Sequence, residues 1–232
     1  MGGNPEAGAK RRFSREKRRE MILDSTAELV AREGTAELSL DTIGQRAGVS
    51  KTLMYRYFRN LVDLLRELLE REYRHLRGKQ FAAAEAANTY EDLVRQVTRA
   101  YLVYIEDRGL IIERLQAYPN IAGAQDPTHF DREPSVEYFS RLTADLYDMP
   151  IDIATAATEI SFGLPASAGE YLIRSGADRQ IVEDVTVAMI LGSLAGVRND
   201  VLGRNLKVRP PSEIIGPLVR PRRPTRPEST EG

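Results

Sequence analysis

The sequence predicts an all-α protein of about nine helices, with a small three-helix head at the N-terminus and a larger helical body behind it. Apolar residues recur every three or four positions through most of the chain, which is the period of an amphipathic helix. No alternating pattern typical of a half-buried strand extends over a useful length, and the sequence has no internal repeat. Glycine, serine and aspartate stand at the ends of the apolar runs, where helices stop and start.

The composition is typical of an ordinary soluble protein. The chain has 232 residues, of which 42% are hydrophobic, enough for one large domain or for a small head and a larger body. The absence of cysteine excludes disulfides, zinc–thiolate sites and cysteine nucleophiles. No uninterrupted apolar run approaches the roughly 18 residues of a membrane-spanning helix, and the polar, basic start is unlike a secretory signal. We therefore expect a cytoplasmic protein without a membrane partner.

The net charge of −1 hides an uneven distribution along the chain. Residues 1–60 contain 12 Lys/Arg against 8 Asp/Glu, and residues 204–232 contain 7 against 3. The segment between them contains 14 against 23. Basic ends on an acidic body are the pattern expected when one part of a protein binds phosphate and the rest does not. Chance clustering is the alternative interpretation.

The head is expected within residues 14–60, after a disordered basic arm over residues 1–13. Its first helix should begin near Ser14 and stop at Gly34. A second short helix should follow Ser39 as its N-cap, and a third should follow Ser50, whose side chain should cap it. Arg59-Asn60 then forms a brief corner before the body.

Residues 39–58 have the pattern of a helix-turn-helix motif. Two helices of about two turns each are joined by Ala47-Gly48-Val49-Ser50, where a glycine can adopt a left-handed φ and the valine can fill the angle between the helices. In the second of these helices Met54 and Phe58 should face inward. The opposite face offers Lys51, Thr52, Tyr55 and Arg56, groups that bind phosphate oxygens and base edges in the major groove. An ordinary amphipathic helix with a solvated polar face would show the same pattern.

The stretch from Arg19 to Leu69 resembles the N-terminal domain of TetR-family transcriptional regulators. The residues that carry the resemblance are Ile22, Leu23, Ala27, Gly34, Ile43, the Ala47–Ser50 turn, Tyr55, Tyr57, Phe58, Asp63, Leu64 and Leu65. The resemblance implies that Thr42 lies on the supporting helix near the DNA backbone, and that Leu53 lies at the start of the recognition helix. It also implies that Tyr55 and Tyr57 contact phosphate. The expected DNA-binding set is therefore Thr42, Ser50, Lys51, Thr52, Leu53, Tyr55, Arg56 and Tyr57.

Two residues depart from the family pattern. Leu53 stands where a small or hydroxylated residue is usual, and could instead touch a thymine methyl group. Leu61 stands where a lysine often binds phosphate, so one backbone contact is expected to be missing unless Arg59 replaces it.

Residues 61–207 are expected to form the body, a ligand-binding and dimerisation domain. It should open with a long connector helix over residues 61–76, followed by an Ala-rich stretch and a helix from Thr89 through Ile105. We expect a separate short helix at residues 110–117, a loop over residues 120–134 and a helix near residues 135–147. The last two helices should span residues 151–173, with a kink at Pro165, and residues 179–202. A disordered tail rich in proline and arginine is expected over residues 208–232.

Small and aliphatic residues on the last helix predict a dimer interface. One stripe permits close helix approach and supplies apolar area, through Ile181, Val185, Ala188, Gly192, Ala195 and Gly196. The family resemblance implies that the last two helices of each subunit pair with their mates in a four-helix bundle. An intramolecular core is the alternative.

Aromatic and aliphatic residues of the central body predict a ligand pocket. The expected lining is Tyr101, Tyr104, Ile105, Leu115, Tyr118, Phe130, Tyr138, Leu142 and Phe162. Apolar walls with tyrosine hydroxyls would suit a hydrophobic or amphipathic small-molecule effector. Each residue taken alone could equally be an ordinary core residue.

Together these patterns predict a sequence-specific DNA-binding regulator. The resemblance implies a homodimeric repressor that leaves a palindromic double-stranded operator when an effector binds its body. The alternative is a DNA-binding regulator without a small-molecule switch, either an activator or a protein controlled by a partner. The chain has two histidines, and it lacks a phosphate-cradling glycine loop, a Gly-x-Ser-x-Gly elbow and a His-Glu-x-x-His pair. We therefore expect no enzyme activity, no cofactor and no metal, and interpret the polar stretch around His129 as a surface loop.

Overall fold

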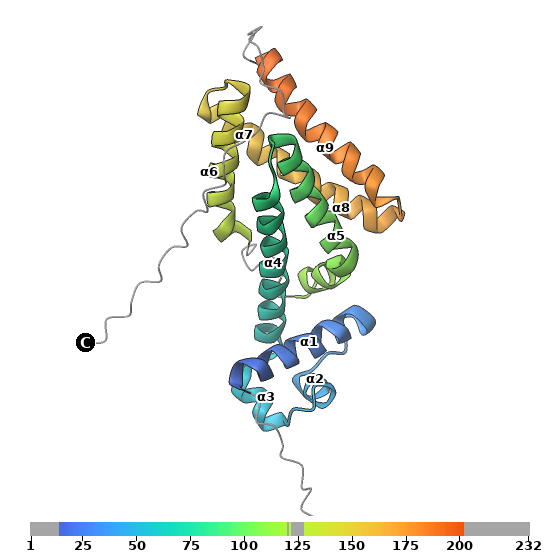
Figure 1. The fold of residues 1–232 in the computed structure, drawn as a ribbon. Coiled ribbons are helices and arrows are strands. Elements are labelled where there is room, and N and C mark those ends of the chain that lie inside the picture. Colours follow the sequence, from blue (N-terminus) through green and yellow to red (C-terminus); the bar gives the residue numbers. More distant parts are fainter. Residues whose placement is uncertain (1–13, 120, 122–127, 202–232) are drawn as a thin grey trace, which may run out of the picture. The chain divides into compact units, whose positions relative to one another are not determined.

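The structure is a computed structural model that describes residues 14–119, 121 and 128–201. The described residues form nine α-helices and one terminal π-turn, and they contain no strand (Figure 1). The predicted all-α class, with a helix-turn-helix head and a helical body, is confirmed. The elements are α1 (Arg15–Glu33), α2 (Leu40–Arg46), α3 (Lys51–Tyr57), α4 (Leu61–Ala86), α5 (Tyr90–Gln116), α6 (Thr128–Tyr147), α7 (Ile151–Ser161), α8 (Gly163–Ser175), α9 (Arg179–Gly196) and η1 (Val197–Val201).

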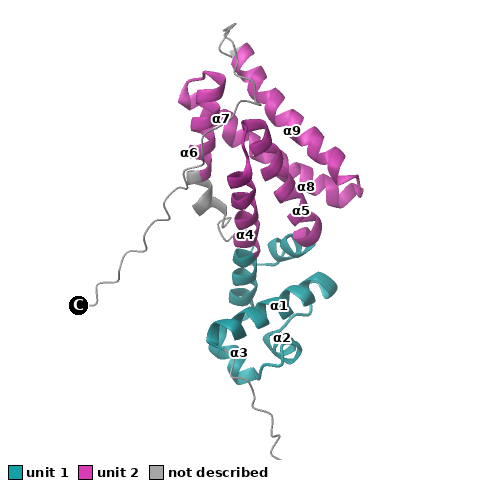
Figure 2. Ribbon diagram, viewed as in Figure 1, with its two compact units in different colours: residues 1–71, 110–124 teal, residues 72–109, 125–232 magenta. Residues whose placement is uncertain are grey.

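The chain divides into two compact units, shown in teal and magenta in Figure 2. Unit 1 comprises residues 1–71 and 110–124, and unit 2 comprises residues 72–109 and 125–232. Two long helices, α4 and α5, each contribute one part to unit 1 and the other part to unit 2. The connector therefore belongs to both units, whereas the sequence suggested a border at residue 60.

Unit 1 is built from local signals that the sequence displays. Ser14 caps α1 by accepting a hydrogen bond from the Lys17 amide at 3.2 Å, and Gly34 ends this helix with φ 79°. The helix α2 packs against both α1 and α3. The fully buried apolar residues of unit 1 include Ile22, Leu23, Ile43, Met54, Leu64, Leu65 and Leu68.

Unit 2 has its main core where α6 packs on α7 and where α9 lies against both. Tyr90, Leu93, Tyr147, Ala154 and Leu194 are among the residues buried there. A smaller cluster joins Leu102, Leu172 and Val182, which come from α5, α8 and α9. These clusters hold the last helices against α5 and leave their other sides exposed.

The predicted break between residues 105 and 110 is wrong, because α5 continues from Tyr90 to Gln116. Gly109 lies inside α5, where it serves close packing within unit 2. A Cβ atom at this position would come within 2.6 Å of Ile173 Cδ1 and 3.0 Å of Ile105 Cγ2. The absence of a side chain at Gly109 therefore leaves room for Ile173 of α8, and the helix α5 continues through this position.

Two further boundaries differ from the prediction. The loop expected over residues 120–134 is shorter, because α6 already begins at Thr128 and runs through position 134. The single kinked helix expected over residues 151–173 is two helices, α7 and α8, that meet at Phe162. Pro165 is the third residue of α8, where a missing N–H costs little. In a continuous helix its ring would clash with the carbonyl of Ser161, so the ring disfavours such a helix.

The C-terminal helix begins as the sequence predicts and ends earlier. The Asp178 carboxylate accepts hydrogen bonds from the Gln180 and Ile181 amides at 2.7 and 3.2 Å. The α-helix ends at Gly196 and continues as the π-turn η1. The predicted arm over residues 1–13 and the predicted tail over residues 208–232 lie outside the described residues.

Candidate nucleic-acid interface

The turn between α2 and α3 has the geometry that its glycine predicts. Gly48 has φ 65°, in the left-handed region, and a Cβ atom there would meet no neighbour. The Val49 amide donates to the Gly44 carbonyl at 2.8 Å, and the Gly48 amide donates to the Gln45 carbonyl at 3.2 Å. This pair of bonds is a Schellman motif, which satisfies the last carbonyls of α2 while the chain turns into α3.

Gly44 is a structural residue of the motif that the sequence analysis missed. A Cβ atom on it would lie 2.8 Å from Met54 Cγ and 3.0 Å from the Val49 carbonyl oxygen. The absent side chain therefore allows α2 and α3 to approach each other closely. A glycine inside a short helix was the available signal, because glycine lowers helix stability unless packing requires it.

Replacement of Gly44 by valine is expected to destabilise the protein by roughly 1–3 kcal/mol, since overpacking forces Met54 and the turn apart. The matched control is Gly78→Val, because a Cβ atom at Gly78 in α4 meets nothing within 4 Å. Chemical denaturation monitored by circular dichroism compares the two variants with the wild type. An equal effect of both substitutions would contradict the close-approach role of Gly44.

The recognition helix α3 presents the predicted polar face. Met54 is fully buried and Phe58 is 2% exposed, so the opposite side of the helix is turned to solvent. Thr42, Ser50, Lys51, Thr52, Tyr55 and Arg56 are exposed, whereas Leu53 and Tyr57 are half-buried. Tyr55 is 51% exposed, which is unusual for a large aromatic side chain and leaves both its ring and its hydroxyl accessible.

The two serine caps of the motif behave differently. The Ser39 hydroxyl accepts a hydrogen bond from the Thr42 amide at 3.0 Å and lies 2.7 Å from the Thr42 hydroxyl. Ser50 precedes α3 as expected, but its side chain forms no capping hydrogen bond with this helix. The predicted capping role of the Ser50 hydroxyl is therefore wrong, and the hydroxyl stays exposed.

Lys51, the first residue of α3, forms an ion pair with Asp41 of α2. Its ammonium nitrogen lies 2.6 Å from Asp41 Oδ2, and this hydrogen bond raises the pKa of Lys51 above its ordinary value. The other oxygen of the same carboxylate, Oδ1, is shielded from solvent and has no hydrogen-bond partner among the described residues. The charge of Lys51 is therefore partly engaged before any DNA is bound.

Polar contacts fix α1 within unit 1. Arg19 forms a two-pronged ion pair with Glu67 of α4, and its guanidinium lies 4.8 Å from the centre of the Phe58 ring. The side chain of Arg19 is therefore engaged in contacts within the head. Arg71 of α4, only 4% exposed, binds the acidic residues Glu20 and Asp24 of α1 at 3.1 and 2.7 Å.

The C-terminal end of α1 is held by the unit 1 part of α5. Arg114 donates to the carbonyl oxygens of Val30 and Ala31 at 2.7 and 2.9 Å, which satisfies two acceptors at this helix end. Contacts from α4 and α5 thus fix the orientation of α1, against which α2 packs. The sequence offered no signal for the Arg114 contact, because its partners are backbone carbonyls more than 80 positions away.

An all-α protein whose head has this geometry falls in the class of helix-turn-helix proteins, and the comparisons with known proteins place it more narrowly. Residues 22–68 match the family profile described as "Bacterial regulatory proteins, tetR family". The head of this chain therefore matches the tetR family, which confirms the resemblance seen in the sequence.

Two curated relatives and one solved structure illustrate the similarity. The HTH-type transcriptional repressor KstR of Rhodococcus jostii is 32% identical over 38% of this chain and 42% of its own length. The HTH-type transcriptional activator FasR of Mycolicibacterium smegmatis is 28% identical over 45% of this chain and 47% of its own length. The chain thus spans less than half the length of these relatives.

The crystal structure of the TetR-like regulator LfrR from Mycobacterium smegmatis in complex with proflavine matches 78% of this chain and 98% of LfrR, with 20% identity and a TM-score of 0.55. At this level of identity the match concerns the fold alone. It extends over much more of the chain than the family profile does, so the fold of the all-α body is also similar to that of LfrR.

The predicted ligand residues are divided between the two units. Leu115 and Tyr118 belong to unit 1, whereas Tyr101, Tyr104, Ile105, Tyr138, Leu142 and Phe162 belong to unit 2. Phe130 lies in α6 among residues whose side chains are not described. Phe162 packs edge-to-face on Phe139, a residue absent from the predicted set, with the ring centres 5.7 Å apart.

Tyr104 has a structural partner in unit 2. Its hydroxyl donates to the fully buried carboxylate of Glu72 at 2.8 Å, and Arg108 binds the same carboxylate at 2.7 and 2.9 Å. Burial raises the pKa of Tyr104 above its ordinary value, and the hydrogen bond from its neutral hydroxyl to Glu72 raises it further. Burial also raises the pKa of Tyr101 to about 12. Both hydroxyls are therefore neutral donors at physiological pH.

The outer sides of α8 and α9 form an exposed apolar face. On α9, Ile181, Val185 and Met189 are 64%, 53% and 52% exposed, and Ala188 and Gly192 are exposed beside them. Ala195 and Gly196 are half-buried. An open groove of about 360 Å³ runs along this face, and its lining comprises Leu164, Ser167, Ala168, Tyr171, Ala177, Ile181, Val182, Val185, Thr186 and Met189. None of the predicted ligand residues lines this groove.

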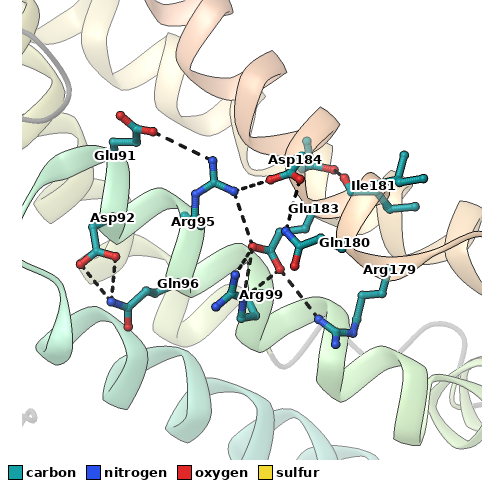
Figure 3. Close-up of polar contacts among 12 residues, drawn as sticks. Glu91, Asp92, Arg95, Gln96, Arg99, Arg179, Gln180, Ile181, Glu183 and Asp184 are labelled. Atoms are coloured by element: carbon teal, nitrogen blue, oxygen red, sulfur yellow. Dashed lines mark hydrogen bonds and ion pairs between the residues drawn. The ribbon is translucent and has the colours of Figure 1, made fainter.

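The opposite side of α9 is bound to α5 through a cluster of ion pairs (Figure 3). Glu183 is fully buried, and Arg99 binds both of its carboxylate oxygens, with Nη2 2.8 Å from Oε1 and Nε 2.9 Å from Oε2. Arg95 and Arg179 lie 3.7 and 3.8 Å from the same carboxylate. Arg95 also binds Asp184, and this contact lowers the pKa of Asp184. The sequence analysis missed this cluster.

Proposed function

We propose that this protein is a sequence-specific DNA-binding transcriptional regulator that binds double-stranded DNA through Thr42, Ser50 and the exposed residues of α3. The single observation that carries the proposal is the composition of the α3 face. A cation, two hydroxyls and a guanidinium stand exposed opposite a buried Met54 and Phe58, on a helix-turn-helix of the tetR family. Such side chains read phosphates and base edges in the major groove.

The protein acts as a homodimer in this proposal, because one helix-turn-helix covers only half of a palindromic site. The exposed apolar face of α8 and α9 supports the assignment of the dimer interface, since large exposed apolar patches mark interaction surfaces. Four of the six predicted interface residues are exposed there: Ile181, Val185, Ala188 and Gly192.

A protein partner fits this face better than a lipid bilayer. The segment Arg179–Asn199 is long and apolar enough to cross a membrane by length and composition, and a third of its most apolar window is buried. Its charged residues Arg179, Glu183 and Asp184 are bound to side chains of α5. When one side of a helix is bound by ion pairs and the other side is apolar, the apolar side is expected to pack against protein.

The regulator is proposed to be a repressor that a hydrophobic or amphipathic small molecule releases from its operator. The relative KstR is named a repressor, and the structural neighbour LfrR was solved with proflavine, an aromatic ligand. The helices α4 and α5 take part in both units, so a ligand that changes their packing in unit 2 acts on helices that also hold α1. The ligand must bind the released state more tightly than the DNA-bound state.

The proposal is tested by selecting duplexes from a random pool with the full-length protein and sequencing those that are retained. A palindromic consensus with half-sites about one helical turn apart is expected. A reporter gene placed behind that consensus then gives the sign of regulation: a repressor lowers expression, and an activator, as the relative FasR is named, raises it. Absence of any enriched sequence would contradict the proposed function.

Release by an effector is tested by adding proflavine or palmitate to the protein bound to its consensus duplex. Loss of DNA binding with either compound supports a small-molecule switch and gives its chemical class. Retention of DNA binding with a broad panel of apolar compounds would favour a regulator without such a switch.

A further inference from the structure

Asp41 occupies a position in the head where a negative charge works against DNA binding. It lies in the first turn of α2, and its Oδ2 atom holds the ammonium group of Lys51 at the start of α3. The side chain of Lys51 is 68% exposed and that of Asp41 is 44% exposed, so the pair lies at the surface that carries the exposed residues of α3. The only cation on the first turn of α3 is thus paired with an acid of the same motif.

Three features make this pairing more than a chance surface contact. The distance of 2.6 Å is that of a charge-assisted hydrogen bond. The second oxygen of Asp41 is shielded from water and has no partner among the described residues, so Lys51 provides the charge compensation of this carboxylate. The other nearby positive field comes from the N-terminal end of α2, which favours an acid in its first turn.

We propose that Asp41 lowers the affinity of the protein for DNA by weakening the contact of Lys51 with the DNA backbone. This inference rests on the proposed function. To reach a phosphate, Lys51 must leave Asp41, whose carboxylate then loses its counter-ion and lies close to the phosphates. Backbone contacts supply sequence-independent affinity, so holding Lys51 back lowers binding to all duplexes and leaves base contacts to select the operator.

The test measures Kd for the consensus duplex and for an unrelated duplex by fluorescence anisotropy at several salt concentrations, with full-length wild type and Asp41→Asn. The variant is expected to bind both duplexes roughly three- to ten-fold more tightly. Its slope of log affinity against log salt should be steeper by about 1, the value of one added phosphate contact. The ratio of the two affinities should stay the same, because a contact with the DNA backbone acts alike on all sequences.

A double-mutant cycle separates this mechanism from a general electrostatic effect. In the Lys51→Gln background, the Asp41→Asn substitution should lose its effect. The matched control is Glu37→Gln, which removes the same charge from an exposed residue of the head, one with no described ion-pair partner. This control should change either affinity less than two-fold. Circular dichroism of each variant checks that the head is folded.

Two outcomes would overturn the inference while the proposed function stands: Asp41→Asn binds the consensus no more tightly than wild type, or its gain persists in the Lys51→Gln background. Weaker consensus binding by Asp41→Asn would instead indicate that Asp41 accepts a hydrogen bond from a base. If the wild type binds no duplex selectively at any salt concentration, the proposed function itself fails, and the inference fails with it.

Discussion

Replacement of Glu183 by alanine is expected to destabilise the protein by about 3 kcal/mol, with a fall in melting temperature of roughly 6–12 °C. Glu183 is fully buried and is bound by both prongs of the Arg99 guanidinium, with two further arginines within 4 Å. Its removal leaves three cations around an empty position. This loss of stability is at the lower end of what the breaking of a buried ion pair costs, because the side chain of Arg99 is 49% exposed and its charge can be solvated by water.

Asp184 provides the matched control for this prediction. It follows Glu183 directly, is 53% exposed and also binds Arg95. Because solvent screens this pair, Asp184→Ala should change the melting temperature only slightly. Thermal unfolding followed by circular dichroism compares the two variants. Similar effects of both substitutions would contradict the view that the buried carboxylate fastens α9 to α5.

Replacement of Val185 by aspartate is expected to weaken dimerisation on the order of a hundred-fold. Val185 is 53% exposed in the isolated subunit and lines the groove between α8 and α9, so a charge there leaves the fold of one subunit intact. In a two-fold symmetric interface the substitution occurs twice, and two carboxylates would be buried or brought together. Operator affinity should fall with it, because a monomer contacts only one half-site.

Sedimentation velocity over a range of protein concentrations measures this effect directly. Phe81→Asp is the control, since Phe81 is a 43% exposed aromatic residue on α4 that does not line the groove between α8 and α9. We expect the control to remain dimeric. A dimeric Val185→Asp variant, or a monomeric wild type, would contradict the assignment of the interface.

The head could be predicted from the sequence because its signals are local. Ser14, Gly34, Ser39 and Gly48 each mark a helix end within a few residues, and the structure places each of them there. Helix starts and stops of this kind depend on backbone conformation and on hydrogen bonds over three or four positions. Packing could be predicted only in part: the inward faces of Met54 and Phe58 were evident, whereas the close approach at Gly44 was not.

The body was predicted less well because its determinants are distant in sequence. Glu183 and Arg99 are 84 positions apart, and no local pattern distinguishes a buried glutamate from an exposed one. Glycine and proline were also ambiguous there: Gly109 allows a close contact inside α5, and Pro165 follows a break at Phe162 rather than causing a kink at its own position. The predicted ligand residues remain a hypothesis, because aromatic residues of a core and of a pocket share the same helical spacing.

The most direct test of the DNA-binding interface is the affinity of the full-length protein for its consensus duplex, compared with that of a Tyr55→Ala/Arg56→Ala double variant, by fluorescence anisotropy at fixed salt. Both side chains are exposed on α3, so their removal should leave the fold intact while affinity falls at least about a hundred-fold. The control Arg32→Ala, at an exposed position in the last turn of α1, should bind within about two-fold of the wild type. Equal affinity of the double variant and the wild type would contradict the assignment of α3 as the recognition helix.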